Sequence, residues 1–359
     1  MEEINNRNEM LELLQQPAFL VQNGIIIQCN QAAELLLIEP GTAVSTLLGS
    51  GAVEYEQFDG GCLYLPVKLP GHQLGASVTR LQDQDIFTLD PDTDQPELRA
   101  MALAARDFRE PLGGVLTLAE RLFPLLEENG TVEIQNQIAQ MNQRLYQMLR
   151  MVVNMSDVSR YHSERQPKLI CQDICAVLDE IFDKASHLVS TAGLTLQYDG
   201  LREPVVCLID EEKLERAVYN ILSNSIKFTA PGGTIRASLT KRDNRLCLSI
   251  QDSGSGIPRS VMGNIFTRYQ RQPGLEDGRY GLGLGMALVR AAATAHEGAV
   301  LITHPAEGGT RITMTLAIRQ SDGTLLRSNV LRVDYAGERD HGLLELSDAL
   351  PFEPYKSER

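Results

Sequence analysis

The chain has 359 residues, and at roughly 100 to 200 residues per domain this length predicts two or three domains. Its formal net charge of -14 argues against a direct nucleic-acid partner, because proteins that bind phosphate backbones present a basic surface. No apolar run approaches the roughly 18 residues of a membrane-spanning helix, and the acidic, polar start is unlike a signal peptide. The 6 cysteines form no CxxC pair, which favours free thiols over a zinc site or disulfides. We therefore expect a cytoplasmic protein without a membrane span.

Residues 1–95 have the pattern of a small domain in which short strands surround one helix. Asn23-Gly24 is a hairpin turn signal between two apolar runs, and a helical pattern follows at 32–38. The predicted strands are separated by Gly, Pro and Asp and lie at 17–22, 25–29, 62–69, 75–81 and 86–89. The stretch 90–96 is acidic and contains prolines, so it is the expected end of this domain.

Residues 96–163 show apolar side chains at steps of three and four in two successive stripes, separated by Asn129-Gly130. This spacing predicts an antiparallel hairpin of two helices. Because each helix could bury only one stripe within the hairpin, a homodimeric four-helix bundle is the simplest arrangement. Packing of the hairpin against a neighbouring domain of the same chain is the alternative. Pro111 lies inside the first helix, where we expect it to kink the helix or remove a hydrogen bond.

Residues 164–320 alternate between helical and strand patterns. The expected helices lie near 173–191, 211–228 and 285–297, and the expected strands near 194–198, 205–209, 234–240, 245–251, 299–303 and 311–318. This order predicts an α/β sandwich, with one sheet and helices on one of its faces. Residues 321–359 form a polar tail with an apolar stretch at 342–350, to which the pattern assigns no chemistry.

Three glycine-rich segments follow one another in the third domain. They are Asp252-Ser-Gly254-Ser-Gly256, Gly281-Leu-Gly283-Leu-Gly285 and Gly308-Gly309-Thr310. Glycines allow the backbone to approach a phosphate chain closely, and a helix that begins after such a loop favours anions. The spacing GxxxxGK[ST] is absent from the sequence, and the second segment is not GxGxxG, so neither a P-loop nor a dinucleotide site is expected.

The helix expected at 211–228 carries Asn220, Asn224 and Lys227 at steps of four and three, so these polar side chains share one face. Asparagine is a mediocre helix former, and its presence twice on one face requires a reason. Amide oxygens can coordinate Mg²⁺, and a lysine ammonium can pair with phosphate oxygens. A solvated helix face is the alternative explanation of this stripe.

In this order, the Asn/Lys stripe and the three glycine segments resemble the ATP-binding domain of bacterial sensor histidine kinases. The resemblance covers about residues 165–320 and includes Ile265-Phe266. It implies the Bergerat fold of Hsp90, DNA gyrase and MutL, with ATP and Mg²⁺ as cofactors. A resemblance of this kind also implies a response regulator or a partner kinase as the binding partner.

The resemblance also implies a role for individual residues. Asn224 would coordinate Mg²⁺, Asn220 would line the same site, and Lys227 would face the phosphates. Asp252 would accept a hydrogen bond from the adenine amino group. The other implied ATP contacts are Gly254 and Gly256 beside the base, Phe266 and either Arg268 or Arg271 in a lid over 257–280, and Gly281, Gly283, Gly285 and Thr310. ATPase relatives have a glutamate at the position of Asn220, and an amide cannot activate water, so phosphoryl transfer is favoured over hydrolysis.

The segment from Ala104 to Leu112 resembles the phosphoacceptor box of the kinase dimerisation domain, F-x-H-E-L-R-T-P-L. Arg106 occupies the position of the acceptor histidine, and a guanidinium has no lone pair with which to attack phosphorus. Asp107, the third implied catalytic residue beside Asn220 and Lys227, has therefore lost the imidazole that it would assist. We expect no autophosphorylation at this box.

The stretch 19–36, in which the hairpin at Gly24 leads to Asn30 and an amphipathic helix, resembles more loosely a PAS sensor domain. A dimerising regulatory module without a ligand is the alternative. The fold expected for the whole chain is multidomain α+β: a PAS-like α/β domain, a two-helix dimerisation hairpin and a Bergerat α/β sandwich. Two functions remain open. The chain is either a histidine-kinase-like enzyme that phosphorylates a residue elsewhere, or a pseudokinase that acts as an ATP-gated, dimeric regulatory protein.

Overall fold

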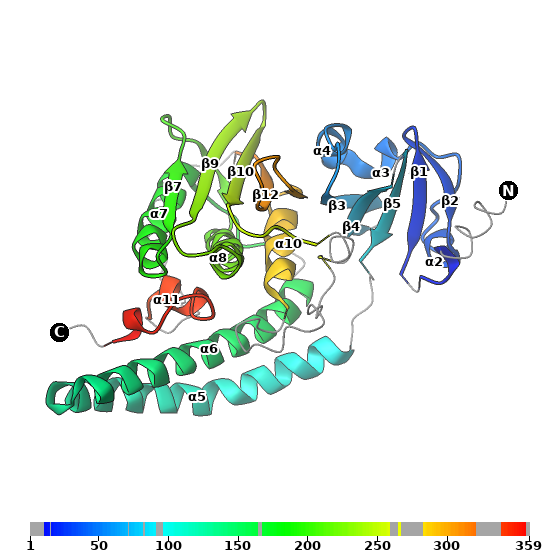
Figure 1. The fold of residues 1–359 in the computed structure, drawn as a ribbon. Coiled ribbons are helices and arrows are strands. Elements are labelled where there is room, and N and C mark those ends of the chain that lie inside the picture. Colours follow the sequence, from blue (N-terminus) through cyan, green and yellow to red (C-terminus); the bar gives the residue numbers. More distant parts are fainter. Residues whose placement is uncertain are drawn as a thin grey trace.

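A computed structural model describes residues 11–14, 16–70, 72–81, 83–90, 96–163, 167–258, 265–266, 283–320 and 339–356. A long twisted sheet carries helices on its faces, and a helical hairpin runs beneath one half of it (Figure 1). This architecture confirms the predicted multidomain α+β class. Within the described residues, no helix is both long enough and apolar enough to cross a membrane.

The N-terminal half of the sheet is antiparallel, with strand order β2-β1-β5-β4-β3. Its strands are β1 (Ala18–Gln22), β2 (Ile25–Cys29), β3 (Cys62–Leu69), β4 (His72–Leu81) and β5 (Gln84–Leu89). Three short helices lie between β2 and β3: α2 (Gln31–Glu34), α3 (Ser45–Leu48) and α4 (Ala52–Glu56). Phe19 and Phe87 stack in its core with their ring centroids 4.8 Å apart.

Asn30 closes the start of this half, immediately after the β1–β2 hairpin. Its buried side-chain oxygen accepts from the backbone N–H groups of Ala18 (2.9 Å) and Ala33 (3.0 Å), the second of which caps α2. Its amide group donates to the carbonyls of Leu14 (3.1 Å) and Gln16 (2.8 Å). A single side chain thus satisfies backbone groups of three segments, which explains why asparagine follows the hairpin.

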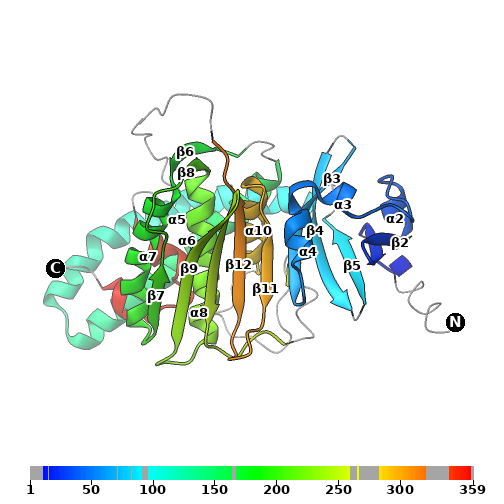
Figure 2. The ribbon, with the colours of Figure 1, turned by 90° about the horizontal axis from the view of Figure 1, so that it is seen from above.

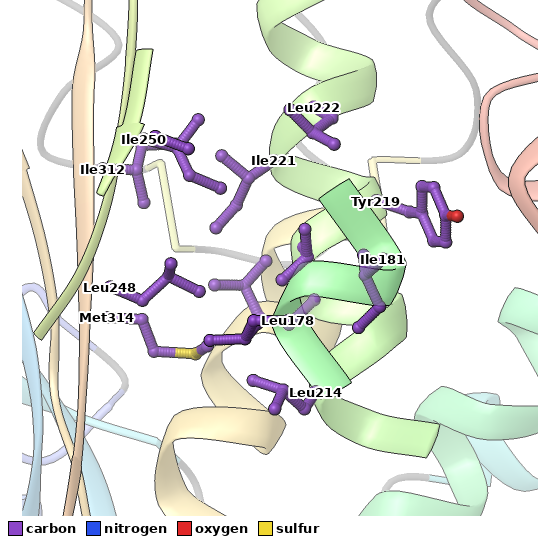
Figure 3. Close-up of a cluster of buried hydrophobic side chains, with 14 of the residues drawn as sticks. Leu178, Ile181, Leu214, Tyr219, Ile221, Leu222, Leu248, Ile250, Ile312 and Met314 are labelled. Carbon is purple, nitrogen blue, oxygen red and sulfur yellow. The ribbon is translucent and has the colours of Figure 1, made fainter. Parts of the chain in front are cut away.

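The second half of the sheet contains the strands of the expected sandwich, in the order β11-β12-β10-β9-β7. They are β7 (Thr195–Asp199), β9 (Thr234–Arg242), β10 (Arg245–Asp252), β11 (Val300–Thr303) and β12 (Arg311–Ala317). One face of this half is covered by three helices, α7 (Ile174–Thr191), α8 (Glu211–Phe228) and α10 (Gly285–Ala295) (Figure 2). Strands β6 (Ile170–Asp173) and β8 (Val206–Ile209) pair in a separate small sheet. The core between sheet and helices is apolar, with Leu248 and Met314 facing Leu178 and Leu214 (Figure 3).

The two halves form one continuous sheet because β3 pairs with β11. Val300, Leu301 and Ile302 lie opposite Tyr64, Leu63 and Cys62 in an antiparallel register. Each half alone would leave the backbone groups of an edge strand unpaired at this position. Arg290 of α10 also contacts the N-terminal half: its Nη1 forms a salt bridge with Asp90 Oδ1 at 2.8 Å. Its guanidinium lies 4.8 Å from the centroid of the Tyr64 ring.

The helical hairpin consists of α5 (Pro96–Asn129) and α6 (Val132–Ser163). Helix α5 continues through both Pro111 and Pro124. Proline has no backbone N–H, so each removes one helical hydrogen bond without ending the helix here. The two helices bury leucine and valine side chains between them: Leu112, Leu116, Leu149 and Val153.

Residues 339–356 are packed against the rest of the chain, where the sequence pattern gives a polar tail with an apolar stretch at 342–350. This segment contains α11 (His341–Glu345) and a short 3-10 turn, η3 (Glu353–Tyr355), and it lies between the hairpin and helices α7 and α8 (Figure 1). Gln143 and Gln147 of α6 donate hydrogen bonds to the carbonyls of Leu350 (2.7 Å) and Ser347 (2.9 Å). These contacts join the segment to the hairpin.

Candidate functional site

Asp252 links the first glycine segment to the third. It is the last residue of β10 and is 7% exposed, and its Oδ1 accepts from the backbone N–H groups of Gly254 (2.9 Å) and Thr310 (3.1 Å). Burial raises the pKa of Asp252, and these hydrogen bonds oppose the rise. A carboxylate offers about four lone-pair sites, so two backbone donors fix its orientation and leave it able to accept from a ligand.

Glycine is required where these segments meet. Gly309 has a φ of +78°, and a Cβ there would lie 1.9 Å from the backbone oxygen of Asp252. A Cβ on Gly254 would lie 2.4 Å from the oxygen of Phe228, at the end of α8. Gly256 also has a positive φ of +75°. The first and third segments therefore contact each other and the end of α8 through their backbones.

The second glycine segment approaches the stripe on α8. A Cβ on Gly285, the first residue of α10, would lie 2.8 Å from the side-chain oxygen of Asn220. Gly283 has a φ of +70°. Gly281 and Arg271 lie outside the described residues, as does most of the expected lid. Phe266 of that segment is described, and it is buried against the Tyr64 ring at a centroid distance of 5.5 Å.

The α8 stripe is not a solvated helix face, because its side chains are covered by other elements. Asn220 is 2% exposed, and its amide donates to the Arg216 carbonyl at 2.8 Å. Asn224 is half-buried, with its amide nitrogen 3.9 Å from the sulfur of Met286. The side chain of Lys227 is 10% exposed.

Burial makes the charged form of Lys227 less stable. It lowers the pKa of this ammonium to about 8, with a further lowering by the nearby Arg150 and an opposing effect of Asp348. At pH 7 the group is still mostly protonated. Because the folded-state pKa is depressed, Lys227 favours the unfolded state near neutral pH, and stability increases as the pH rises above about 8.

Two residues beside the stripe have no signature in the sequence motifs. Arg150 of α6 donates from Nη2 to Asn220 Oδ1 at 3.2 Å and from Nη1 to Asp348 Oδ2 at 2.8 Å. Lys227 Nζ lies 3.6 Å from the same oxygen of Asp348. The only hint in the sequence is that Arg150 is charged within the otherwise apolar run 148–153.

Arg106 and Asp107 lie on the surface of α5. Both side chains are 76% exposed, and Arg106 Nε is 3.7 Å from Asp107 Oδ1. An ion pair this exposed contributes little to stability. The structure thus places Arg106 on an accessible helix face, paired with its own neighbour.

A buried ionic cluster attaches the hairpin and the C-terminal segment to α8. Arg216 is 1% exposed, and its Nε lies 2.7 Å from Oε1 of Glu345, which is 0% exposed. Arg216 also contacts Asp157 of α6, and Arg150 Nε lies 3.3 Å from Glu345 Oε2. One carboxylate from α11 therefore joins two guanidinium groups from different helices.

The chain has recognisable relatives among known proteins. Residues 209–320 match the family of histidine kinase-, DNA gyrase B- and HSP90-like ATPases. The chain is 25% identical over 63% of its length to the hybrid signal transduction histidine kinase D of Dictyostelium discoideum. It is 28% identical over 61% of its length to the adaptive-response sensory kinase SasA of Rippkaea orientalis. These matches cover 15% and 57% of the two relatives, so the chain spans less than two thirds of either.

The fold is also found in a solved structure. The crystal structure of full-length ShkA in complex with AMPPNP is similar with a TM-score of 0.50 and 23% sequence identity, over 62% of this chain and 46% of that one. This likeness concerns the fold.

Proposed function

We propose that this chain binds Mg-ATP in two-component signalling and has no phosphoacceptor histidine on α5. It is a relative of the sensor histidine kinases and has an ATP-binding domain of their type. The observation that carries the proposal is the fixed carboxylate of Asp252, at the meeting point of two glycine segments and the end of α8. Such a carboxylate accepts from an exocyclic amino group, as adenine has.

The side chains on α8 fit a metal–phosphate group. Asn224 supplies an amide oxygen, which is a ligand of the kind that Mg²⁺ accepts, Asn220 lines the same site, and Lys227 supplies a charge for phosphate. Bound Mg²⁺ would neutralise negative charge on the phosphates. Because Lys227 is mostly protonated at pH 7, it can pair with a phosphate oxygen there.

An alternative within the same proposal is a pseudokinase, which binds ATP and transfers nothing. The observation that favours it is the exposed guanidinium of Arg106 at the acceptor position, which cannot act as a nucleophile. Transfer to a response regulator or a partner kinase remains the enzymatic form of the proposal.

We expect the full chain to bind γ-phosphate-labelled ATP in a Mg²⁺-dependent manner without retaining label on α5. Asn224→Ala should weaken Mg-ATP binding by about tenfold or more, through loss of a metal ligand, and should leave binding without Mg²⁺ unchanged. Arg106→His restores an imidazole beside Asp107, so it should gain acid-labile label if the enzymatic form is correct. Equilibrium titration and gel autoradiography measure both effects.

The outcomes separate the alternatives. Absence of ATP binding by the folded chain would refute the proposal. Binding without label in Arg106→His and without transfer to a co-purified regulator supports the pseudokinase. Label in Arg106→His shows that only the acceptor has changed.

We propose in addition that the hairpin forms a homodimer. Several large apolar side chains on α5 are exposed in the single chain, among them Leu118 (60%), Leu122 (53%) and Leu125 (61%). An apolar stripe of this extent favours association with a second copy, as in a four-helix bundle. We also propose a cytoplasmic location, which suits the 6 free cysteines because the cytosol is reducing.

Leu122→Glu should convert the dimer to a monomer, because it places a charge in the proposed bundle core. The measurement is molar mass by light scattering after size exclusion. Leu35→Glu is the matched control, since Leu35 is 80% exposed but lies outside the hairpin. A wild-type chain that is monomeric at micromolar concentration would contradict the proposal.

A further inference from the structure

One carboxylate oxygen of the C-terminal segment is held between two cations beside Asn220. Asp348 Oδ2 lies 2.8 Å from Arg150 Nη1 and 3.6 Å from Lys227 Nζ. The three side chains are 11%, 5% and 10% exposed, respectively, so solvent screens these contacts weakly. The two cations come from α6 and α8, and the anion comes from neither helix.

The same cations would also bind a phosphate oxygen, because a guanidinium and an ammonium both donate to anionic oxygens. The Arg150 guanidinium also donates to the side-chain oxygen of Asn220 at 3.2 Å. The inference rests on the proposed function, in which Lys227 and Asn220 lie at the phosphates of ATP. If so, Asp348 occupies a place at or beside a phosphate group.

Several contacts keep Asp348 in position. The α6 side chains of Gln143 and Gln147 bind the backbone on either side of it, at Leu350 and Ser347. Three residues earlier, Glu345 forms the buried pair with Arg216. A carboxylate tethered in this way has a high effective concentration at the cationic pair.

We propose that residues 339–356 are a built-in competitor of the nucleotide: Asp348 occupies a phosphate position, and Arg150 is a phosphate-binding residue once Asp348 leaves. Binding of a nucleoside triphosphate and docking of Asp348 then exclude each other. Since the segment is attached to α6, nucleotide binding is coupled to its release from the hairpin.

The test is the affinity of the full chain for ATP in three variants. Asp348→Asn keeps the size of the side chain and removes its charge, so it should tighten ATP binding by about tenfold, as expected for a lost charged competitor. Arg150→Gln should weaken binding by about tenfold and should abolish the gain when combined with Asp348→Asn. Glu353→Gln is the matched control, since Glu353 is an exposed carboxylate of the same segment and should change nothing.

A second measurement reports the release directly. Amide hydrogen exchange within 339–356 should increase when ATP is added to the wild-type chain. Equal ATP affinity of wild type and Asp348→Asn, with unchanged exchange in the segment, would overturn the inference and leave the proposed function intact. Failure of every variant to bind ATP would overturn both.

Discussion

Asp252→Asn is expected to weaken ATP binding by about 10- to 100-fold, which is the range for loss of a hydrogen bond to a charged group. The backbone donors of Gly254 and Thr310 would hold the amide oxygen of the new side chain in the place of Oδ1. Its NH₂ group would then be directed at the amino group of adenine, so that two donors face each other. Titration with ATP measures the loss.

The same variant tests whether the base donates the hydrogen bond and residue 252 accepts it. In inosine triphosphate a carbonyl oxygen replaces the amino group, and this oxygen can accept from the new NH₂ group. The preference for ATP over inosine triphosphate should therefore fall or reverse in Asp252→Asn. An unchanged preference, with an unchanged melting temperature, would show that Asp252 does not contact the base.

Glu345→Gln is expected to lower the free energy of unfolding by about 3 to 5 kcal/mol, the usual cost of removing one partner from a buried ion pair. Glu345 is 0% exposed and pairs with both Arg216 and Arg150. The substitution removes the negative charge between two guanidinium groups that are 1% and 5% exposed. Their mutual repulsion is then incompletely compensated.

Denaturant unfolding and differential scanning calorimetry measure this effect, with an expected fall in Tm of very roughly 6 to 20 °C. Glu180→Gln is the matched control, because Glu180 forms an exposed pair with Lys184 at 2.7 Å and should contribute less than about 1 kcal/mol. Equal effects of the two substitutions would show that the ion pairs of Glu345 do not stabilise the domain.

The local elements could be predicted from the sequence because each has a short-range cause. Steps of three and four in the apolar residues indicate the two hairpin helices, and alternation indicates strands such as β10, which buries every second side chain. The N-terminal strands were placed by the turn at Asn23-Gly24 and by the runs between Gly, Pro and Asp. The glycine segments were identified by composition and order, although their mutual contacts at Gly309 and Gly285 depend on the fold.

The long-range pairings could not be predicted, because no local pattern encodes them. The pairing of β3 with β11 forms where the edge strands of two sheets meet. The sequence of each strand is equally compatible with an exposed sheet edge. In the sequence, Asp348 is one of many acidic residues in a polar tail, and Arg150 interrupts an apolar run. Their contacts with Lys227 and Asn220 form only because the fold brings α6, α8 and the C-terminal segment together.

Residue types and spacing alone predict the α+β class and the relation to histidine kinase ATP-binding domains. These properties depend on residue identity and spacing along the chain. Only the folded chain reveals that the N-terminal sheet continues into the ATPase-type sheet and that the C-terminal segment lies on α8. Those features depend on contacts between distant residues, which must pair once the folded chain buries their polar and charged groups.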